Sequence, residues 1–210
     1  MRSKPPGRLA LVAASLPKVC RRHGVPRALR LAASELLFDL RNGTDTSLDP
    51  PRHEGSSPLL FQELVRDLPA QTLQGRFLDF GAGKGRVLLL AARHGYSRVL
   101  GVELSAELCA IAEQNIAHFR RRAPDAVIGV CHADAADFEV PDDTSVGYFF
   151  NPFGDEVMCP VVDRITASLT RVPRRFHVVY LCPLYVEVFL RAGFTPVHRC
   201  GDHGVLLSRG

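Results

Sequence analysis

The sequence predicts an α/β fold: a three-layer sandwich with a seven-stranded, mostly parallel sheet that ends in an antiparallel hairpin, preceded by an N-terminal helical extension. Three observations support this. From residue 77 onward, short apolar and β-branched runs alternate with helical runs, which is typical of parallel strands joined by crossover helices. The last two strand-like runs are separated by a short turn-rich stretch, and so close a join requires a hairpin. With 210 residues, 46% of them hydrophobic, the chain is long enough for one domain with a sizeable core.

The expected elements follow in order along the chain. Residues 7–40 form one or two helices, interrupted near Gly24 and Pro26, whose leucines and alanines pack on or over the main domain. Residues 41–57 form a polar loop, and Ser57-Pro58 starts a helix over 59–68. The remaining elements are strand 77–80, helix 86–94, strand 99–102, helix 106–122, strands 127–131 and 146–150, helix 158–169, strand 176–181, helix 185–191, and the hairpin strands 194–199 and 204–208.

Charge is distributed unevenly along the chain. Residues 1–34 contain eight basic side chains and no acid, and subtracting these eight from 26 leaves 18 basic against 22 acidic residues from position 35 onward. Such a basic arm can meet nucleic acid, an anionic substrate or a membrane surface. A solvated helix whose charges serve only solubility explains the arm equally well.

The six cysteines are widely spaced and lack zinc-finger partners, so we expect no metal site and reduced thiols in a cytoplasmic protein. The stretch Leu9 to Leu16 is too short for a membrane span, and we expect no membrane partner. The sequence does not predict an oligomeric state.

A glycine-rich loop and a later acid carry the strongest chemical signal. The apolar strand 77–80 contains Asp79 and runs into Gly81, Gly83 and Gly85, which open a helix. Glycines there permit positive φ angles and let a ligand approach the backbone. Glu103 ends the next strand, 18 residues beyond Gly85, where a carboxylate can accept hydrogen bonds from both hydroxyls of a ribose.

Three cofactors compete for this pair of features. A P-loop would need glycine where Leu78 stands and Ser or Thr where Gly85 stands. A nicotinamide-binding loop would have its third glycine where Arg86 stands, and its pyrophosphate would meet the charge of Asp79. S-adenosylmethionine contains no phosphate and carries a sulfonium and an ammonium, so an acid at this turn attracts it. The sign of the ligand's charge therefore favours S-adenosylmethionine.

Residues 42–208 resemble the class I S-adenosylmethionine-dependent methyltransferases, whose sheet ends in the same antiparallel hairpin. The resemblance divides the chain into a basic extension that serves as lid or acceptor region, residues 1–57, and a methyltransferase domain, residues 58–210. Asn42-Gly43-Thr44-Asp45-Thr46 and Gly81–Arg86 are similar to a bacterial subgroup of mostly unassigned substrate. The resemblance implies which residues contact the methionine moiety, the ribose and the adenine of the cofactor. They are Asp79, Phe80, Gly81, Ala82, Gly83, Gly85, Glu103, Leu104, Asp134, Ala135 and Asn151.

The run Phe149-Phe150-Asn151-Pro152-Phe153 is similar to the Asn-Pro-Pro-aromatic motif of amino-group methyltransferases, with one proline missing. In those enzymes the Asn oxygen and the following carbonyl accept hydrogen bonds from the target amine, and the aromatic ring covers it. The resemblance implies that Asn151, Pro152 and Phe153 carry the catalytic step, mainly by alignment for displacement. A plain turn after a buried strand is the competing interpretation, since Asn-Pro is a common turn dipeptide.

Other polar residues carry weaker signals. His53, His132, His177 and His198 are each conceivable as a base for an oxygen acceptor. Arg120 to Arg122 close a helix and complement its C-terminal dipole.

The leading hypothesis is N-methylation of a small molecule or of a protein amino group. An RNA methyltransferase guided by residues 1–34 has the same chemistry, and a non-catalytic interaction module is the alternative from a different class.

Overall fold

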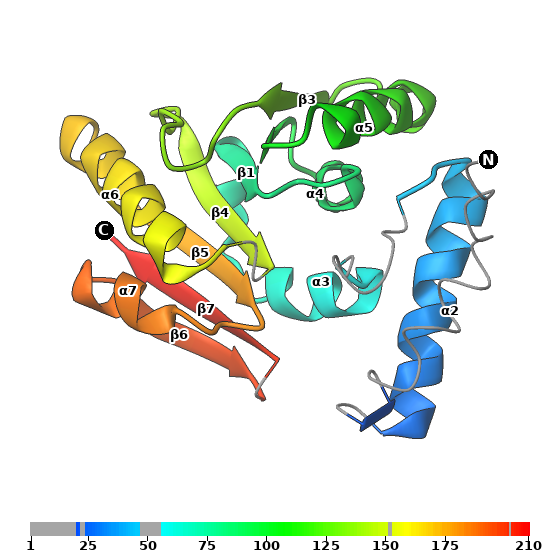
Figure 1. Ribbon diagram of the computed structural model, residues 1–210, viewed down its shortest axis with the longest axis horizontal. Helices are drawn as coiled ribbons and strands as arrows, with labels where there is room; N and C mark the ends of the chain where they lie inside the picture. Colours follow the sequence, from blue (N-terminus) through cyan, green and yellow to red (C-terminus); the bar gives the residue numbers. More distant parts are fainter. Residues whose placement is uncertain (1–19, 22–23, 47–55, 151–152, 202) are drawn as a thin grey trace, which may run out of the picture.

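Seven strands form one sheet in the order β3-β2-β1-β4-β5-β7-β6 (Figure 1). The computed structural model describes residues 20–21, 24–46, 56–150, 153–201 and 203–210. The first five strands in this order pair in parallel, and β7 pairs antiparallel with both β5 and β6. The strands are β1 (Arg76–Phe80), β2 (Arg98–Glu103), β3 (Val127–His132), β4 (Thr144–Phe150), β5 (Phe176–Leu181), β6 (Thr195–Cys200) and β7 (Gly204–Arg209). The predicted sheet and its terminal hairpin are therefore confirmed.

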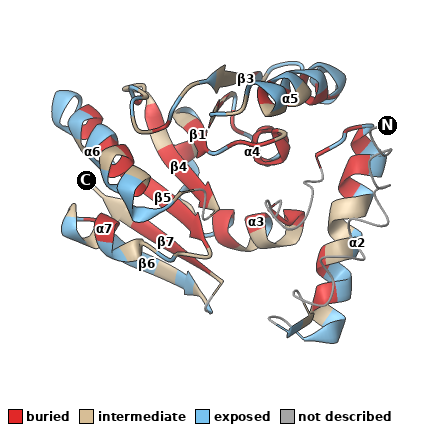
Figure 2. Ribbon diagram, viewed as in Figure 1, coloured by how far each residue is buried: buried red, intermediate tan, exposed pale blue. Residues whose placement is uncertain are grey.

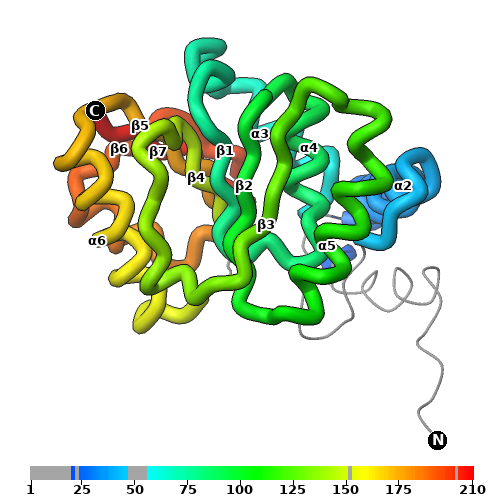
Figure 3. The backbone as a smooth tube through the Cα atoms, turned by 90° about the horizontal axis from the view of Figure 1, so that it is seen from above, coloured from blue at the N-terminus to red at the C-terminus, as the bar shows by residue number. Residues whose placement is uncertain are grey.

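Helices cover both faces of the sheet, as expected for parallel strands joined by crossovers (Figure 3). Helices α3, α4 and α5 pack on one face, and α6 and α7 pack on the other. The helices are α2 (Val25–Asn42), α3 (Pro58–Val65), α4 (Arg86–His94), α5 (Ala106–Phe119), α6 (Asp155–Arg171) and α7 (Val186–Arg191), with short 3₁₀ turns η1 (Ala70–Gln74) and η2 (Arg120–Arg122).

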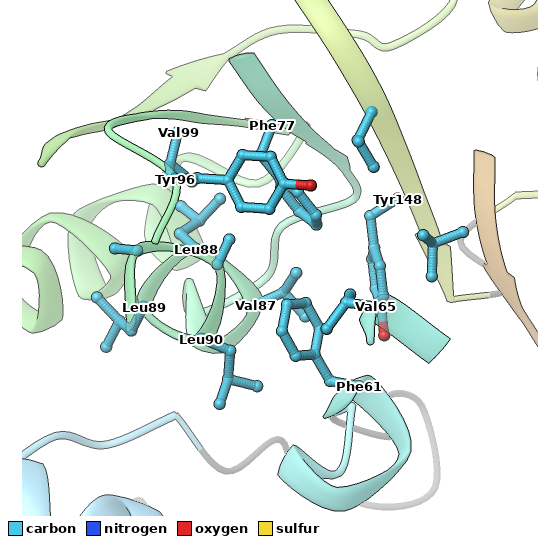
Figure 4. Close-up of a cluster of buried hydrophobic side chains, with 14 of the residues drawn as sticks. Phe61, Val65, Phe77, Val87, Leu88, Leu89, Leu90, Tyr96, Val99 and Tyr148 are labelled. Atoms are coloured by element: carbon cyan, nitrogen blue, oxygen red, sulfur yellow. The ribbon is translucent and has the colours of Figure 1, made fainter. Parts of the chain in front are cut away.

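The core on the α4 side is built around aromatic side chains. The ring of Phe61 on α3 lies 6.0 Å from that of Phe77 on β1 and 5.8 Å from that of Tyr148 on β4. Tyr96 closes the cluster, with its ring 5.0 Å from that of Phe77. Figure 4 shows these rings packed beside the leucines of α4. Four of the five residues of β1 are buried, so the strand that leads into the glycine loop is fixed from both sides.

Helix α2 contacts the domain along only part of its surface. It begins after Gly24, has a proline in its first turn, and ends at Gly43 in the left-handed conformation. Leu31 and Phe38 are buried. The prediction that the leucine and alanine side packs on the domain is correct only in part, because Leu29 and Leu40 remain 52% and 61% exposed. Figure 2 shows both buried and exposed residues along α2.

Several element boundaries differ from the prediction. Helix α5 ends at Phe119, and the three arginines that follow form η2. Helix termini often tighten into such 3₁₀ turns. Helix α6 begins at Asp155, earlier than expected, with two acids in its first turn that suit the positive end of the helix dipole. Across the described residues, no helix is long and apolar enough to cross a membrane.

Candidate cofactor and acceptor site

The glycine loop joins β1 to α4 at the carboxyl edge of the parallel strands. Gly81, Gly83 and Gly85 have φ angles of 83°, 54° and 83°, which other residues adopt only with strain. The backbone N–H groups of Gly81 and Ala82 both donate to the carbonyl of Val102, at 2.9 and 3.0 Å. The loop therefore folds back over the end of β2, with its backbone in the conformation that the sequence predicts.

A glycine in β2 allows this close approach. A Cβ atom at Gly101 would lie 2.6 Å from the Cβ of Ala82, closer than real side chains come. Ala82 is itself buried. The loop consequently rests on the backbone of β2, next to the acid that ends that strand.

Glu103 connects the glycine loop to the start of α5. Its Oε2 accepts a hydrogen bond from the Gly83 N–H at 2.8 Å, and its Oε1 accepts one from the Ser105 N–H at 2.9 Å. Each oxygen of a carboxylate can accept more than one hydrogen bond. The side chain is half-buried, so the carboxylate is held in place by the backbone and retains acceptor capacity for a ligand.

Asp79 lies one residue before the end of β1 and is only 3% exposed. Burial raises the pKa of its carboxyl well above the ordinary value, and the charge of Glu103 raises it further. In the strand register Asp79 is opposite Tyr148, whose hydroxyl donates to Ser56 Oγ at 2.7 Å. Burial also raises the pKa of Tyr148. Asp79 is thus an acid whose ionisation is costly unless a cation accompanies it.

The residues expected to meet the adenine follow β3. The Ala133 N–H donates to the carbonyl of Glu103 at 3.0 Å, which holds this loop against the end of β2. Asp134 is exposed, and its Oδ1 accepts from the Ala136 N–H at 2.9 Å. Ala135 is buried, and the side chain of Leu104 is 67% exposed. Glu103, Leu104, Asp134 and Ala135 therefore gather at the ends of two adjacent strands.

The predicted acceptor motif lies at the end of β4, the strand on the other side of β1. Asn151 and Pro152 are outside the described residues. Phe150, just before them, is opposite Leu181 at the end of β5. Phe153, just after them, is half-buried and packs against the core on the α6 side.

The histidines are spread over the molecule. His53 is outside the described residues. His177 is near the start of β5, buried, and its pKa is lowered chiefly by desolvation. His198 is on β6, and its Nε2 lies 3.3 Å from Oδ2 of Asp67, which follows α3. His132 ends β3, and its Nε2 lies 3.0 Å from the carbonyl oxygen of Leu104, so it is the one described histidine of these three at the cofactor edge.

Comparisons with known proteins point to methyltransferases. A family model described as a methyltransferase domain matches residues 77–175. Residues 77–175 are thus similar to a methyltransferase domain, and the solved structures that share the fold include S-adenosylmethionine-dependent methyltransferases. These findings support the family, the enzyme class and the cofactor predicted from the sequence. A search of the curated proteins gives no match.

Solved structures share the fold at low identity. An S-adenosylmethionine-dependent methyltransferase from Mesorhizobium loti is 18% identical, with 70% of this chain and 94% of that one covered and a TM-score of 0.51. Geranyl diphosphate C-methyltransferase from Streptomyces coelicolor is 14% identical, with 72% and 76% covered and a TM-score of 0.56. The O-methyltransferase region StiE O-MT is 14% identical, with 66% and 52% covered and a TM-score of 0.52, so this chain spans about half its length.

Arg86, the first residue of α4, is buried, and in the sequence it stands out only as the position where a nicotinamide-binding loop would have its third glycine. Its partners include two acids and one hydroxyl from the N-terminal extension. The sequence signal for this role is a charged residue at a helix position where the apolar pattern predicts a buried side chain.

Proposed function

We propose that the chain transfers the methyl group of S-adenosylmethionine to a nitrogen acceptor, an amino group of a small molecule or of a protein. The observation that carries the proposal is the position of Phe149 and Phe150, which end β4 directly before Asn151 in the sequence. Because β4 is parallel to β1 and adjacent to it, the end of β4 lies at the same edge of the sheet as Asp79 and the glycine loop. The structural neighbours include proteins named as a C- and an O-methyltransferase, so the fold by itself does not select the acceptor atom.

The described residues suit a cationic nucleoside. Asp79 is a buried carboxyl with a raised pKa, and a positive charge nearby would favour its ionised form. The carboxylate of Glu103 is fixed by two backbone N–H groups and can accept ribose hydroxyls. Asp134 and Ala135 supply an acceptor and a buried wall for an adenine ring. S-adenosylmethionine, when bound, supplies an electrophilic methyl group.

In the proposed reaction the chain orients the acceptor. The side-chain oxygen of Asn151 and the carbonyl that follows it accept hydrogen bonds from the amine, which leaves the nitrogen lone pair directed at the methyl carbon. The nitrogen–carbon bond forms as the carbon–sulfur bond breaks, its electron pair stays on sulfur, and the nitrogen loses a proton to solvent. Alignment of this kind can supply several kcal/mol of rate enhancement, about 7–11 kcal/mol in favourable cases.

The acceptor atom can be tested by mass spectrometry. Incubation with S-adenosylmethionine and a panel of amines, peptides and RNA is expected to add one methyl group to a nitrogen. Asn151→Ala is expected to lower kcat by about 100-fold or more, because alignment is lost, and to change the Kd for S-adenosylmethionine by no more than a few-fold. If only hydroxyl or carbon acceptors gain the methyl group, the assignment of Asn151 is wrong.

A second candidate acceptor, RNA, is favoured by a cluster of exposed arginines. Arg122 on η2 donates to Asn42 Oδ1 on α2 at 3.4 Å, and the guanidinium of Arg93 on α4 lies 5.8 Å from the ring centre of Phe38 on α2. Both η2 and α4 thus contact the C-terminal part of α2. The exposed cluster is Arg41, Arg93, Arg120, Arg121 and Arg122.

The RNA alternative makes a salt-dependent prediction. If RNA is the acceptor, its affinity should fall steeply between 50 and 200 mM salt, by about 10³-fold for some six phosphate contacts. Arg121→Gln combined with Arg122→Gln should reduce the slope by about two. Filter binding with a short single-stranded RNA measures both quantities. Weak binding with a slope near zero would leave the amine as the preferred acceptor.

A further inference from the structure

Arg86 is a buried cation at the positive end of a helix dipole, and two acids of α2 compensate for its charge. It is the first residue of α4, directly after Gly85, where the helix dipole is positive. Its side chain is 3% exposed. Its Nη1 lies 3.1 Å from Glu35 Oε2, and its Nη2 lies 3.6 Å from Asp39 Oδ2. A buried charge of this kind requires paired partners, and both of these acids come from the N-terminal extension.

Asp39 also organises the segment that follows α2. It is completely buried, and its Oδ1 accepts hydrogen bonds from the hydroxyls of Thr44 at 2.9 Å and Thr46 at 2.6 Å. The Arg86 Nε–H donates to Thr46 Oγ1 at 2.8 Å. The hydroxyl of Thr46 therefore accepts from the guanidinium and donates to the carboxylate, which makes the three side chains one continuous network.

Asn115 on α5 makes a second connection between the same two segments. Its Oδ1 accepts from the Asp45 N–H at 2.9 Å, and its Nδ2 donates to the carbonyls of Asp45 at 2.9 Å and Lys84 at 3.0 Å. Lys84 is inside the glycine loop, and its Nζ lies 3.6 Å from Asp45 Oδ2. Residues 44–46 are thus attached to the loop at Lys84 and to the residue after the loop at Arg86.

We infer that Arg86 is a positioning residue through which the N-terminal extension and the cofactor loop stabilise each other. The inference rests on the proposed role of the glycine loop in binding S-adenosylmethionine. A ligand that orders the loop fixes Lys84 and Arg86, which in turn fix residues 44–46 and the end of α2. Thermodynamic linkage makes the two effects equal in size. The factor by which S-adenosylmethionine favours the docked position of α2 is therefore also the factor by which docking of α2 raises the affinity for S-adenosylmethionine.

Arg86→Lys tests this coupling, because lysine keeps the charge but has no planar fork with which to contact Glu35, Asp39 and Thr46 together. In the unmodified protein, S-adenosylmethionine is expected to slow amide hydrogen exchange over residues 38–46 by about 5- to 100-fold. In Arg86→Lys, calorimetric titration should show an affinity for S-adenosylmethionine lower by a similar factor. The effect of the ligand on exchange over 38–46 should be lost as well.

Arg27→Gln is the matched control. Arg27 also holds α2, through an ion pair of 2.7 Å with Glu63 on α3, but it is far along the helix from the glycine loop. It should speed exchange near residue 27 and leave the affinity for S-adenosylmethionine within about twofold, as expected for a partly exposed pair. An equal loss of affinity in both variants would mean that general loosening of α2, rather than Arg86, is responsible, and would overturn the inference.

The outcomes separate this inference from the proposed function. If the unmodified protein does not bind S-adenosylmethionine, the proposed function fails, and the coupling fails with it. If it binds the ligand but exchange over 38–46 does not change, or if folded Arg86→Lys binds normally, only the coupling fails. Should Arg86→Lys not fold, Glu35→Gln replaces it, since Glu35 is at the 26% exposed end of the network. A several-fold loss of affinity in Glu35→Gln supports the coupling, and normal affinity overturns it.

Discussion

Asp79→Asn is expected to lower the affinity for S-adenosylmethionine by about 10- to 100-fold while it raises the thermal stability of the ligand-free protein. A hydrogen bond to a charged group contributes about 1.5–3 kcal/mol, which corresponds to this loss of affinity when the charge is removed. Asparagine keeps the size and shape of the side chain. Titration calorimetry measures the affinity, and a thermal melt without ligand measures the stability.

The sign of the stability change follows from the raised pKa of Asp79. Between the ordinary pKa of an aspartate and this raised value, the folded protein binds more protons than the unfolded chain, so stability falls as the pH rises through that window. Asparagine removes this cost. Over the same window the affinity of the unmodified protein for S-adenosylmethionine should increase with pH, because binding of the cation requires the carboxyl to lose its proton. Asp79→Asn should lack this pH dependence.

Asp143→Asn is a control of opposite sign. Asp143 precedes β4 at the other edge of the sheet and lies 2.9 Å from Arg76 and 3.0 Å from Arg98. The hydrogen bond from Arg76 is the main cause of its lowered pKa, so its charge stabilises the fold above the ordinary pKa and this contribution is lost as the pH falls. The substitution should reduce stability and leave cofactor affinity unchanged. If Asp79→Asn binds S-adenosylmethionine as tightly as the unmodified protein, Asp79 does not hold the cation.

The order of strands and helices could be predicted because each strand is marked by its own residues. The run 176–181 is buried at every position in the structure, and a strand covered on both faces is apolar along nearly all of its length, with His177 the exception here. The hairpin could be predicted from the short turn between its two strands. Boundaries were less predictable: the arginines after Phe119 suit either the end of a helix or a 3₁₀ turn, and local sequence does not choose between them.

The candidate site was predictable where the chemistry is local and not where it depends on distant segments. The glycine loop and Glu103 carry their own signature. In the sequence Asp79 is simply a negative charge at the turn, whereas in the structure its burial, which depends on the packing of several strands, makes that charge costly. The role of Arg86 depends on Glu35 and Asp39, about fifty residues earlier, in a segment whose periodicity predicts only a helix with an apolar side.

Glu103→Ala is expected to weaken binding of S-adenosylmethionine by about 100-fold or more, since two hydrogen bonds from ribose hydroxyls to a charged acceptor would be lost. It also removes the acceptor of the Gly83 and Ser105 N–H groups, which are 2.8 and 2.9 Å from the carboxylate. The free energy of unfolding should therefore fall by about 1–3 kcal/mol, the usual cost of unpaired polar groups. Affinity and stability decrease together here, whereas Asp79→Asn changes them in opposite directions.

Glu107→Ala distinguishes the specific contacts of Glu103 from its charge. Glu107 is an exposed acid in the first turn of the same helix, α5, so its removal takes away one negative charge near the same helix terminus without disturbing the glycine loop. Its cost should be about 0.3–1 kcal/mol of stability, through the helix dipole alone, and the affinity for S-adenosylmethionine should stay within about twofold. Glu103→Gln retains two acceptor lone pairs on one oxygen, so its affinity for S-adenosylmethionine should lie between those of Glu103→Ala and Glu107→Ala. Because a general electrostatic effect would act from either position, equal losses of affinity in Glu103→Ala and Glu107→Ala would contradict a ribose contact at Glu103.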